Sequence, residues 1–456
     1  MDIIARIHND FSTKFGLPRQ SSLAPSLLSR IVFEPGFRNP DALRGLDGFS
    51  HIWLIWDFSE FHSDGWSPTV RPPRLGGNTR LGVFATRSPN RPNPIGLSCV
   101  KLESIDMEGP DGPVITVSGA DLMDGTPIFD IKPYLPAFES HPDARDGFVG
   151  ENPSEPLEVV IPGDMEAVLR EVLDETRMQT LREVLAQDPR PAYHNDPGRE
   201  YGLDYAGLDV HFKVDGNTLT VVEKRPVTMA VLNLTPDSFW APSRWDMDVL
   251  TCGADIVDIG AVSTRPGAAP VSEDEEWTRL EPVLRGIADR TVAVSEGTRI
   301  SIDTTRSGIV RKAFAVIGPF IVNDISAGLD DREMLQTVGE LGLTYVAMHK
   351  RGGPQTMDAL TDYPQGIVNE VISYFEDFSK RAALSGIKDW ILDPGFGFAK
   401  TEAQNIELLR GLGRLRRFGR PILAGIADKR FTHGRTSALQ KLALLCGADI
   451  LRVHVK

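Results

Sequence analysis

The stretch that decides the fold is Val231-Leu-Asn-Leu-Thr-Pro-Asp-Ser-Phe239, near the middle of the chain. An apolar run of strand character stops at Asn233, and a Thr-Pro-Asp-Ser loop follows it directly. The same pattern recurs toward the C-terminus: a short apolar run, a polar residue at its end, then a helical stretch. The predicted strands are Met229–Asn233, Ile256–Gly260, Arg299–Asp303, Ile321–Asp324, Thr344–His349, Trp390–Asp393, Pro421–Gly425 and Ile450–His454.

Strands that alternate with helices in this way predict a parallel (β/α)8 barrel, known as a TIM barrel. The apolar runs are continuous rather than alternating, as expected of strands buried on both faces. The active site of such a barrel lies at the C-terminal ends of its strands. Those ends carry Asn233, Asp258, Asp303, Asn323, His349, Asp393, Lys429 and His454. Because the rhythm is absent upstream of about residue 226, we predict a multidomain chain with a join near Lys224.

The composition is that of an ordinary globular protein with more than one domain. A chain of 456 residues is too long for one hydrophobic core, and 41% hydrophobic and 25% charged residues are usual values. No apolar run approaches the ~18 residues of a membrane span. The N-terminus lacks the basic start and long apolar core of a signal peptide. We therefore predict a cytoplasmic protein with no membrane partner.

The cysteines and histidines give no sign of a metal or redox centre. Cys99, Cys252 and Cys446 are odd in number, widely spaced and set among apolar residues, so we expect buried thiols in a reducing compartment. The nine histidines include no His-Glu-x-x-His motif, and no Cys-x-x-Cys pair is present. A zinc site built by the protein is therefore not expected.

A basic segment stands out in the N-terminal half. The net charge of −14 argues against general nucleic-acid affinity, but residues 66–102 contain no carboxylate. Their cations are Arg71, Arg74, Arg80, Arg87, Arg91 and Lys101. Proline and glycine exclude a helix here, so we predict loops joining short strands of an antiparallel β-barrel or sandwich. The predicted strands are His51–Trp56, Gly82–Ala85, Leu97–Lys101 and Val114–Ser118. The arginines are either a solvated surface or contacts to phosphate and other anions.

Long irregular motifs in this half resemble the tRNA-methyltransferase O (TrmO) family. They are Pro18-Arg-Gln20, Phe49–Phe58, Val70–Asn78, Val83–Gly96 and Asp124–Pro136, and Leu181–Tyr193 resembles the family's C-terminal subdomain. The resemblance implies an antiparallel β-barrel, usually dimeric, that uses S-adenosyl-L-methionine. The implied reaction is N6-methylation of threonylcarbamoyladenosine beside the anticodon of tRNA.

The same resemblance suggests where the substrates lie. The implied S-adenosylmethionine contacts are Pro18, Arg19, Gln20, Arg87, Leu97, Ser118, Gly119, Ala120 and Asp121. Asp130, Lys132 and Tyr134 would face the tRNA. An amine that attacks a sulfonium methyl in line needs positioning and desolvation more than acid–base help. The alternative readings are turn residues for Asp121 and Asp130, and a surface pair for Arg19.

Residues 151–225 are predicted as a separate small subdomain. Apolar residues at helical spacing predict one amphipathic helix over Met165–Gln187, with a structural role. Two apolar runs, Leu208–Phe212 and Leu219–Val222, are separated by Asp215-Gly-Asn217 and predict a β-hairpin. The predicted domains are therefore residues 1–150, 151–225 and 226–456.

Motifs over about residues 228–456 resemble dihydropteroate synthase. They include Leu232–Phe239, Gly253–Gly260 with Ser263–Gly267, Ser301–Thr304, Val322–Ser326, Met348-His349, Leu392–Phe398 and Ile450–His454. The resemblance implies condensation of 6-hydroxymethyl-7,8-dihydropterin diphosphate with p-aminobenzoate to 7,8-dihydropteroate, a step of folate synthesis.

The residue types suit that chemistry. A flat, amide-rich pterin needs buried donors and acceptors, and a leaving diphosphate needs cations. The expected pterin and diphosphate contacts are Thr264, Arg265, Asp303, Asn323, Met348, Asp393, Lys429, Arg452 and His454. Among them, Arg265, Asp303 and Lys429 are the predicted catalytic residues. Asn233 matches the family residue that touches Mg²⁺, an ion held mainly by the diphosphate.

The sequence departs from this family after the seventh strand. The family usually reads Gly-x-Ser-Arg-Lys-Ser, whereas this chain reads Gly425-Ile-Ala-Asp-Lys-Arg430. Ala427 and Asp428 therefore change the end where p-aminobenzoate is expected. Phe431–Gly447 is shorter than in the family, and the chain ends at Lys456, so we expect a barrel without its last helix.

These departures leave several functions open for the second half. It is an active synthase, a synthase with altered arylamine use, or an inactive pterin-binding remnant. Pterin-binding barrels also transfer methyl groups from methyltetrahydrofolate to corrinoid proteins, although the Thr-Pro-Asp-Ser-Phe and Ser-Thr-Arg-Pro-Gly loops favour a diphosphate substrate. A further alternative is a scaffold that only stabilises or dimerises the methyltransferase.

Overall fold

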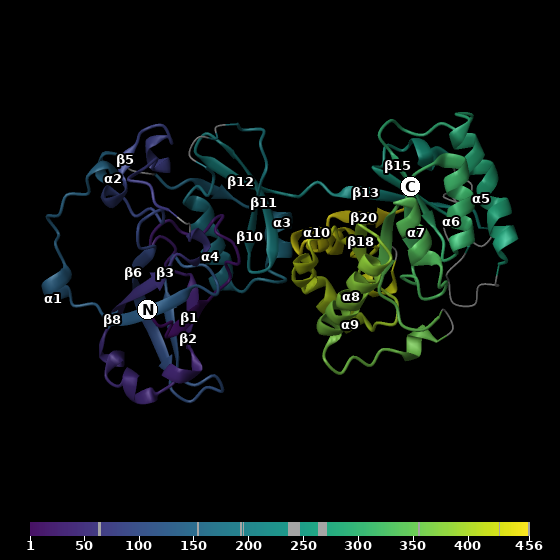
Figure 1. The fold of residues 1–456 in the computed structure, drawn as a ribbon. Coiled ribbons are helices and arrows are strands. Elements are labelled where there is room, and N and C mark those ends of the chain that lie inside the picture. Colours follow the sequence, from purple (N-terminus) through teal and green to yellow (C-terminus); the bar gives the residue numbers. More distant parts are fainter. Residues whose placement is uncertain are drawn as a thin grey trace. The chain divides into compact units, whose positions relative to one another are not determined.

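The computed structural model describes residues 1–62, 65–152, 155–191, 194, 196–235, 247–262, 271–353, 356–427 and 429–454, apart from the side chain of Asp358. The chain divides into two compact units, Met1–Glu223 and Lys224–Lys456 (Figure 1). Each unit has its own hydrophobic core. The two units are therefore described separately.

The first unit is built on a closed antiparallel barrel with the strand order β1-β2-β7-β6-β3-β8. Its strands are β1 (Ala5–His8), β2 (Leu28–Phe33), β3 (His51–Asp57), β6 (Ile95–Asp106), β7 (Val114–Ser118) and β8 (Pro127–Pro133). Along β3, burial alternates residue by residue, with Ile52, Leu54 and Trp56 inside the barrel. The predicted antiparallel barrel is confirmed.

One predicted strand of this unit was wrong. Residues 82–85 divide between the short strand β5 (Leu81–Gly82) and the 3-10 helix η6 (Val83–Ala85). The Val83 carbonyl accepts both the backbone N–H of Thr86 at 3.1 Å and its hydroxyl at 2.8 Å, which turns the chain out of the strand. β5 pairs with β4 (Thr69–Val70). The other 3-10 helices are Pro35–Phe37, Pro40–Leu43, Leu46–Gly48, Ser59–Phe61 and Pro73–Leu75.

The small subdomain is a four-stranded sheet with the order β10-β11-β12-β9, packed with helices. The strands are β9 (Glu158–Val160), β10 (Tyr201–Tyr205), β11 (Leu208–Asp215) and β12 (Thr218–Val222), and the helices are α3 (Gly163–Leu169) and α4 (Glu175–Ala186). The short helices α1 (Pro136–Glu139) and α2 (Phe148–Glu151) lie between β8 and this subdomain. The hairpin prediction is confirmed. The single helix predicted over residues 165–187 was wrong. Asp174 caps a new helix by accepting the backbone N–H of Arg177 at 2.8 Å.

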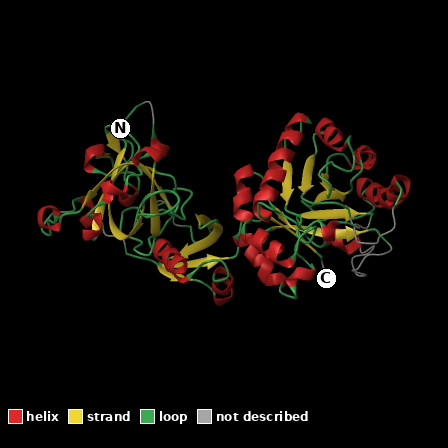
Figure 2. Cartoon of the chain, turned by 90° about the horizontal axis from the view of Figure 1, so that it is seen from below, coloured by secondary structure: helices red, strands yellow, loops and turns green. Residues whose placement is uncertain are grey.

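The second unit is an eight-stranded parallel sheet with the order β18-β17-β16-β15-β14-β13-β20-β19. A bridge between Leu392 and Ile422 brings its two ends together, and helices surround the strands (Figure 2). The strands are β13 (Val227–Asn233), β14 (Ile256–Gly260), β15 (Arg299–Asp303), β16 (Ile321–Asp324), β17 (Thr344–Met348), β18 (Trp390–Asp393), β19 (Leu423–Ala424) and β20 (Ile450–Val453). The predicted (β/α)8 barrel is confirmed.

The outer layer of this barrel consists of helices that follow the strands. They are α5 (Glu273–Ala288), α6 (Ser307–Ile317), α7 (Met334–Leu341), α8 (Ile367–Leu384), α9 (Glu402–Arg410) and α10 (Thr436–Leu445), with 3-10 helices at Met247–Thr251, Met357–Ala359, Leu412–Phe418 and Arg430–Thr432. β20 is the last element of the described residues, which end at His454. Inside the barrel, strand residues such as Met229, Ile256 and Ile321 form a common apolar cluster.

The cysteines differ from one another in exposure. Cys446 is buried, which raises the pKa of its thiol to about 12, and Cys99 is half-buried. Cys252 is exposed, so the prediction of three buried thiols was wrong for this residue. It follows the 3-10 helix at the edge of the second unit, where its apolar neighbours Val249 and Leu250 are buried and it is not. Within the described part of the chain, no helix is long and apolar enough to cross a membrane.

Candidate functional site

The strand ends of the second unit bring the predicted polar residues to one level. In the register of the sheet, Asn233 lies opposite Gly260, Gly260 opposite Asp303, and Asp303 opposite Asn323. Gly260 lies between Asn233 and Asp303. A Cβ added at Gly260 would be in contact with both side chains, 3.7 Å from Asn233 Oδ1 and 3.5 Å from Asp303 Cβ. Three of the predicted site residues therefore share the C-terminal edge of adjacent strands.

A buried charge cluster lies just below this edge. Asp258, which is fully buried, accepts hydrogen bonds from Ser301 Oγ at 2.7 Å and from Asn323 Nδ2 at 2.9 Å. Arg452 adds two more, from Nε at 3.0 Å and from Nη2 at 2.8 Å. The same Nη2 lies 3.3 Å from Asp303 Oδ2. Asp258 was noted as a strand-end residue but was not predicted as part of the site, and it fixes both Arg452 and Asn323.

The electrostatics of the cluster set the protonation of Asp303. Burial and the neighbouring carboxylate of Asp258 raise the pKa of Asp303 to about 7, and Arg452 opposes that rise. The shift favours the protonated, neutral form of Asp303 more than in a free carboxyl group. In its two forms it can accept hydrogen bonds from a ligand or donate one, which suits a planar ligand with an amide-like edge.

Asp393 and Lys429 belong to the same end of the barrel. Asp393 ends β18 opposite Met348, and its carboxylate accepts the backbone N–H of Gly395 at 2.8 Å. Burial raises the pKa of this carboxyl group. Lys429 Nζ lies 4.5 Å from the ring centroid of Phe398, and burial lowers the pKa of the amine to about 8. The loop after β18 thus lies between an acid and an amine that were both predicted as ligand contacts.

A second buried lysine, Lys400, supports that loop and was not predicted. Its Nζ donates to the carbonyl oxygens of Gly395 at 2.8 Å and Phe398 at 3.0 Å, and lies 3.0 Å from His349 Nδ1. Burial and the nearby lysine lower the pKa of His349 well below its usual value, so the neutral imidazole accepts at Nδ1. These contacts favour a structural role for His349, as a support of the loop after β18.

Replacing Lys400 by Met should change how the stability of the second unit depends on pH. Burial lowers the folded-state pKa from 10.5 to about 7, so unfolding takes up a proton between these values and the wild-type free energy of unfolding rises with pH. One group contributes at most about 1.4 kcal/mol per pH unit. The Met variant lacks this rise. The substitution therefore lowers the free energy of unfolding more at pH 10.5 than at pH 7, the two ends of this pH window. Urea unfolding at both ends measures the difference.

Lys388→Met is the matched control, because Lys388 is exposed. A cost for Lys400→Met that is the same at both ends of the window would contradict the expected burial of the Lys400 amine.

The first unit brings three of its predicted segments together. Ser22 N donates to Gly119 O at 2.8 Å, and a Cβ at Gly119 would lie only 3.2 Å from Ser22 Cα, so the segment after Gln20 lies against residues 118–121. Gly119 has a φ of +73°, a conformation that glycine tolerates best. Arg87 Nη1 donates to Gln20 Oε1 at 2.6 Å and joins the basic loop to the same place.

A hydrogen-bonded chain from the barrel interior ends at Asp121. Trp56 Nε1 donates to Ser98 Oγ at 3.0 Å, and Ser98 Oγ donates to Asp121 Oδ1 at 2.5 Å. Burial raises the pKa of Asp121, while Ser98 and the charge of Arg87 oppose the rise. These contacts join Asp121 to the barrel interior through Ser98. Ser98 was not predicted, although it lies next to the predicted Leu97, which is exposed on the outer face of β6.

Other predicted residues of this unit have different partners. Arg19 Nη2 donates to the carbonyl oxygens of Asp188 at 2.9 Å and Arg190 at 3.1 Å, so it ties the barrel to the small subdomain. Ser118 Oγ donates to Glu103 at 2.6 Å. Pro18 is buried, and Ala120 belongs to the barrel core. Lys132 pairs with Asp130 at 2.9 Å. The ring of Tyr134 packs edge-on against Trp53.

Some predicted residues fall outside the described part of the chain, or have few described contacts. Thr264, Arg265 and Asp428 lie outside it. Met348 is buried at the end of β17, and His454 is half-buried directly after β20. Within the described ranges, no group of three or more His, Cys, Asp or Glu side chains could hold a metal ion.

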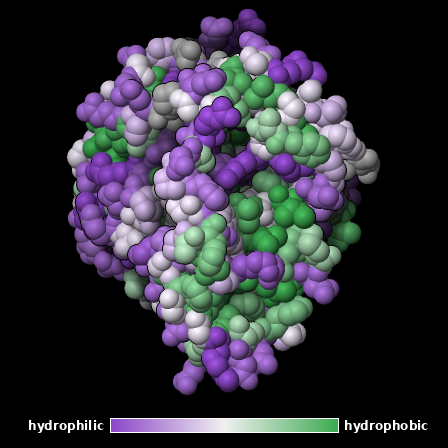
Figure 3. Space-filling view, turned by 90° about the vertical axis from the view of Figure 1, so that its left-hand side faces the viewer, coloured by the Kyte–Doolittle hydropathy of each residue, from purple (hydrophilic) through white to green (hydrophobic). Residues whose placement is uncertain are grey.

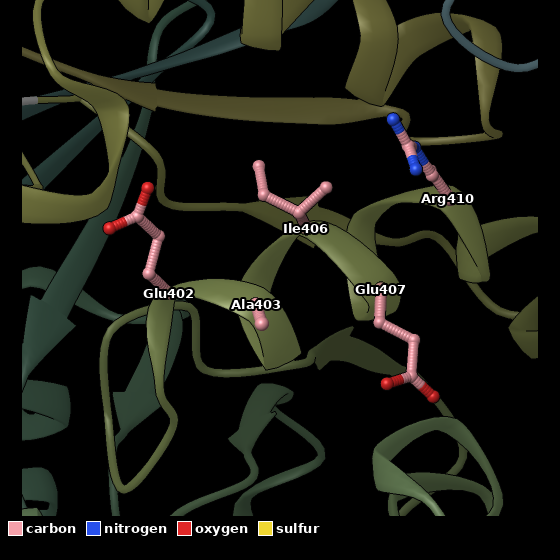
Figure 4. Close-up of a pocket in the computed structure, with 5 residues that line it drawn as sticks. All are labelled: Glu402, Ala403, Ile406, Glu407 and Arg410. Atoms are coloured by element: carbon pink, nitrogen blue, oxygen red, sulfur yellow. The ribbon is translucent and has the colours of Figure 1, made fainter.

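The surface depression in Figure 4 belongs to helix α9 of the second unit. Its volume is about 680 Å³, and Glu402, Ala403, Ile406, Glu407 and Arg410 line it, all from helix α9. A site lined by one helix can contact a ligand from one side only. None of these five residues belongs to the clusters described above. The depression is therefore not assigned to either site.

Comparisons with known proteins match the two units to two different families. Residues 6–140 match the model of the tRNA-methyltransferase O N-terminal domain, residues 154–226 that of the TrmO C-terminal domain, and residues 229–454 that of pterin binding enzymes. The chain is 44% identical over 205 residues to a tRNA (adenine(37)-N6)-methyltransferase of Escherichia coli K12, covering 44% of this chain and 86% of the relative.

The second half has relatives of its own. It is 38% identical over 263 residues to a dihydropteroate synthase of Synechocystis, covering 52% of this chain and 88% of the relative. Among solved structures, a dihydropteroate synthase of Yersinia pestis is 31% identical, with a TM-score of 0.45 over 52% of this chain and 91% of that one.

Proposed function

This chain belongs to the tRNA-methyltransferase O family in its first half and to the dihydropteroate synthase family in its second, and on that premise we propose one bifunctional enzyme. The first activity is S-adenosylmethionine-dependent N6-methylation of threonylcarbamoyladenosine at position 37 of tRNA. The second is condensation of 6-hydroxymethyl-7,8-dihydropterin diphosphate with p-aminobenzoate to 7,8-dihydropteroate. The proposed domains are residues 1–150, 151–225 and 226–456.

For the first activity, the supporting observation is the convergence of Arg87, Gln20 and Asp121. S-adenosylmethionine supplies the methyl group when bound. The residues that would hold it offer a cation at Arg87, an amide at Gln20 and a buried carboxyl group at Asp121. Such a set can bind an amino-acid moiety and hydroxyl groups, and it can orient the donor for an in-line approach of the substrate nitrogen.

For the second activity, the supporting observation is the buried cluster of Asp258, Asp303, Asn323 and Arg452. Asp303, Asn323 and Asp393 would bind the edges of the pterin ring, whose amide and amino groups need fixed donors and acceptors. Lys429 and Arg452 contribute positive charge beside the position of the leaving diphosphate. The C–O bond breaks and the diphosphate leaves with its electron pair, so that a cation stabilised by the pterin remains. The aryl amine attacks the methylene carbon of this cation and releases a proton to solvent.

The donor set fits a magnesium ion held mainly by substrate. Asn233 contributes one amide oxygen at the strand ends, a hard ligand of the kind that Mg²⁺ accepts. Magnesium often keeps several waters and takes few ligands from the protein. We therefore propose that Asn233 touches a Mg²⁺ ion that arrives with the diphosphate.

Paired assays of the purified chain test the proposal. One measures transfer of labelled methyl from S-adenosylmethionine to tRNA, and the other measures dihydropteroate formation from the dihydropterin diphosphate, Mg²⁺ and p-aminobenzoate. Product in both assays supports a bifunctional enzyme. Calorimetry with the dihydropterin diphosphate separates the alternatives for the second half, because binding without turnover supports a remnant and no binding supports a scaffold.

The alternative function is an active tRNA methyltransferase whose barrel is inactive or altered. It is favoured by Ala427 and Asp428, which replace a serine and an arginine of the family pattern. A homodimer and a cytoplasmic location also stay predictions. Sedimentation of the purified chain measures the first of these.

Replacing Asp428 by Arg should strengthen the use of p-aminobenzoate. Asp428 lies outside the described residues, so this prediction rests on the sequence. A carboxylate at ~4 Å from the substrate carboxylate costs about 1–4 kcal/mol, which is roughly five- to a thousandfold in affinity. The Michaelis constant for p-aminobenzoate should fall by a factor in that range. Asp389→Arg, at an exposed carboxylate of the same unit, is the control. An unchanged constant would mean that Asp428 points away from the substrate.

A further inference from the structure

Two large aromatic side chains of the first unit lie together on its surface. Trp66 is 50% exposed and Phe84 is 71% exposed, and their ring centroids are 5.9 Å apart at an interplanar angle of 31°. The contact is built by the backbone, because Trp66 precedes β4 and Phe84 follows β5, and these strands pair with each other. Pro68 O accepts the backbone N–H of Val83 at 3.0 Å and extends the pairing toward the rings. We name Trp66 and Phe84 the aromatic platform.

Val83 explains why Phe84 points outward. Val83 is buried, and the 3-10 helix η6 that it begins turns the next side chain to the surface. Val83 therefore anchors this segment in the apolar interior. Phe84 and Trp66 contribute apolar area to the surface. An exposed aromatic pair of this kind signals a binding surface.

The surroundings of the platform are basic. The guanidinium of Arg91 lies 5.9 Å from the Phe84 centroid, and its Nη1 donates to Thr86 O at 2.9 Å. Arg71 and Arg80 are exposed, and within the described residues no ion pair joins Arg71, Arg80 or Arg91 to a carboxylate. The sequence from residue 66 to residue 102 contains no Asp or Glu at all, in a chain of net charge −14.

These features favour a nucleic acid over a protein partner. Aromatic faces stack on every base, and unpaired arginines attract phosphates, so a single strand meets both kinds of group. We propose that the aromatic platform stacks unpaired bases of the RNA substrate, with Arg71, Arg80 and Arg91 on its phosphates. This inference rests on the proposed tRNA methylation and adds a binding surface to it.

The position of the platform fits that role. Phe84 and Arg91 flank Arg87 in one short loop, and Arg87 reaches Gln20 at the proposed donor site. Because Phe84 and Arg87 belong to the same loop, a base that stacks on the platform keeps the RNA strand near the arginine proposed to bind the methyl donor. On the face that Figure 3 shows, hydrophobic side chains gather into areas bordered by hydrophilic ones.

Phe84→Ala in the full chain is expected to weaken binding to a labelled RNA hairpin with an unpaired loop. Stacking of one base contributes about 1–3 kcal/mol, so the loss should be roughly five- to 150-fold by fluorescence anisotropy. Phe84→Trp should restore affinity, since it replaces one ring by another. Binding to a fully paired duplex of the same length should change little, because its bases are already stacked.

Phe37→Ala is the matched control, because Phe37 is also an exposed aromatic residue of this unit and lies outside the platform. Unchanged hairpin affinity for Phe84→Ala would overturn the inference. If the variant also shifts from dimer to monomer in sedimentation, the platform is instead a contact between two copies of the chain.

The binding assay does not depend on methyl transfer. If the wild-type chain binds the hairpin through Phe84 but methylates no tRNA, the proposed activity fails and the platform stands. If the wild type methylates tRNA and Phe84→Ala has the same Michaelis constant for tRNA, the platform fails and the activity stands.

Discussion

An Asp258→Ala variant is expected to lose about 3–5 kcal/mol of the free energy of unfolding of the second unit. Asp258 is fully buried and accepts four hydrogen bonds, two of them from Arg452. Without the carboxylate, the Arg452 guanidinium keeps, within the described residues, only the 3.3 Å contact to Asp303, and the Asn323 side chain loses its Asp258 acceptor. Removal of one member of a buried pair is costly because the other charge stays buried without compensation.

Hydrogen exchange of the full chain, followed peptide by peptide, assigns the loss to the second unit and leaves the first as an internal reference. Ser301→Ala is the matched control: it removes one neutral hydrogen bond to the same carboxylate and should cost only about 0.5–1.5 kcal/mol. A loss for Asp258→Ala no larger than that of Ser301→Ala would show that Arg452 finds a new partner, and the cluster would not be the support of the site.

The strand pattern of the second unit could be predicted because its strands are buried on both faces. Continuous apolar runs end at the polar residue that reaches the site, so β14, β15, β16 and β18 have the predicted bounds. The seventh strand is shorter than predicted. Pro421 has no N–H to donate, and the N–H of Ile422 donates to the Asp449 side chain at 3.0 Å instead of to a neighbouring strand. Ile422 is joined to Leu392 by an isolated bridge, and β19 begins only at Leu423.

The supports of the site could not be predicted in the same way. Arg452 and Asp258 are 194 residues apart, and Lys400 and His349 are 51 residues apart. A strand-end residue is identified by its place in a local pattern, whereas a buried partner is defined only by the packing of distant strands. Lys400 follows a glycine-rich loop and has the local signature of an exposed lysine, yet its amine is buried against backbone carbonyls.

The break between α3 and α4 shows a limit of periodicity. Leu169, Leu173 and Leu181 keep helical spacing, and all three are buried, so the apolar stripe continues across the break. Spacing alone cannot distinguish one helix from two that pack on the same core. The sequence did contain one indication of a second helix. Asp174 is a residue type that favours the N-terminal cap of a helix.

The proposed donor site of the first unit depends on contacts between three loops rather than on strands. Ser22 and Gly119 fix two of these loops through a backbone hydrogen bond of 2.8 Å, and Arg87 joins the third through Gln20. Arg87 is exposed and contributes no packing to the barrel core. Its contribution is therefore expected in binding and orientation of the methyl donor, and the fold does not require it.

An Arg87→Ala variant is accordingly expected to lose at least about a hundredfold in methyl transfer to tRNA, since the loss of a positioning contact has an effect of that size. The free energy of unfolding should stay within about 0.5 kcal/mol of wild type, as is usual for an exposed side chain. Labelled methyl transfer, calorimetry with S-adenosylhomocysteine and urea unfolding provide the measurements. Arg44→Ala is the control, because in the part of the chain that the structure describes this exposed arginine pairs with Asp41 alone. Retained methyl transfer in Arg87→Ala would mean that the donor lies elsewhere on the barrel.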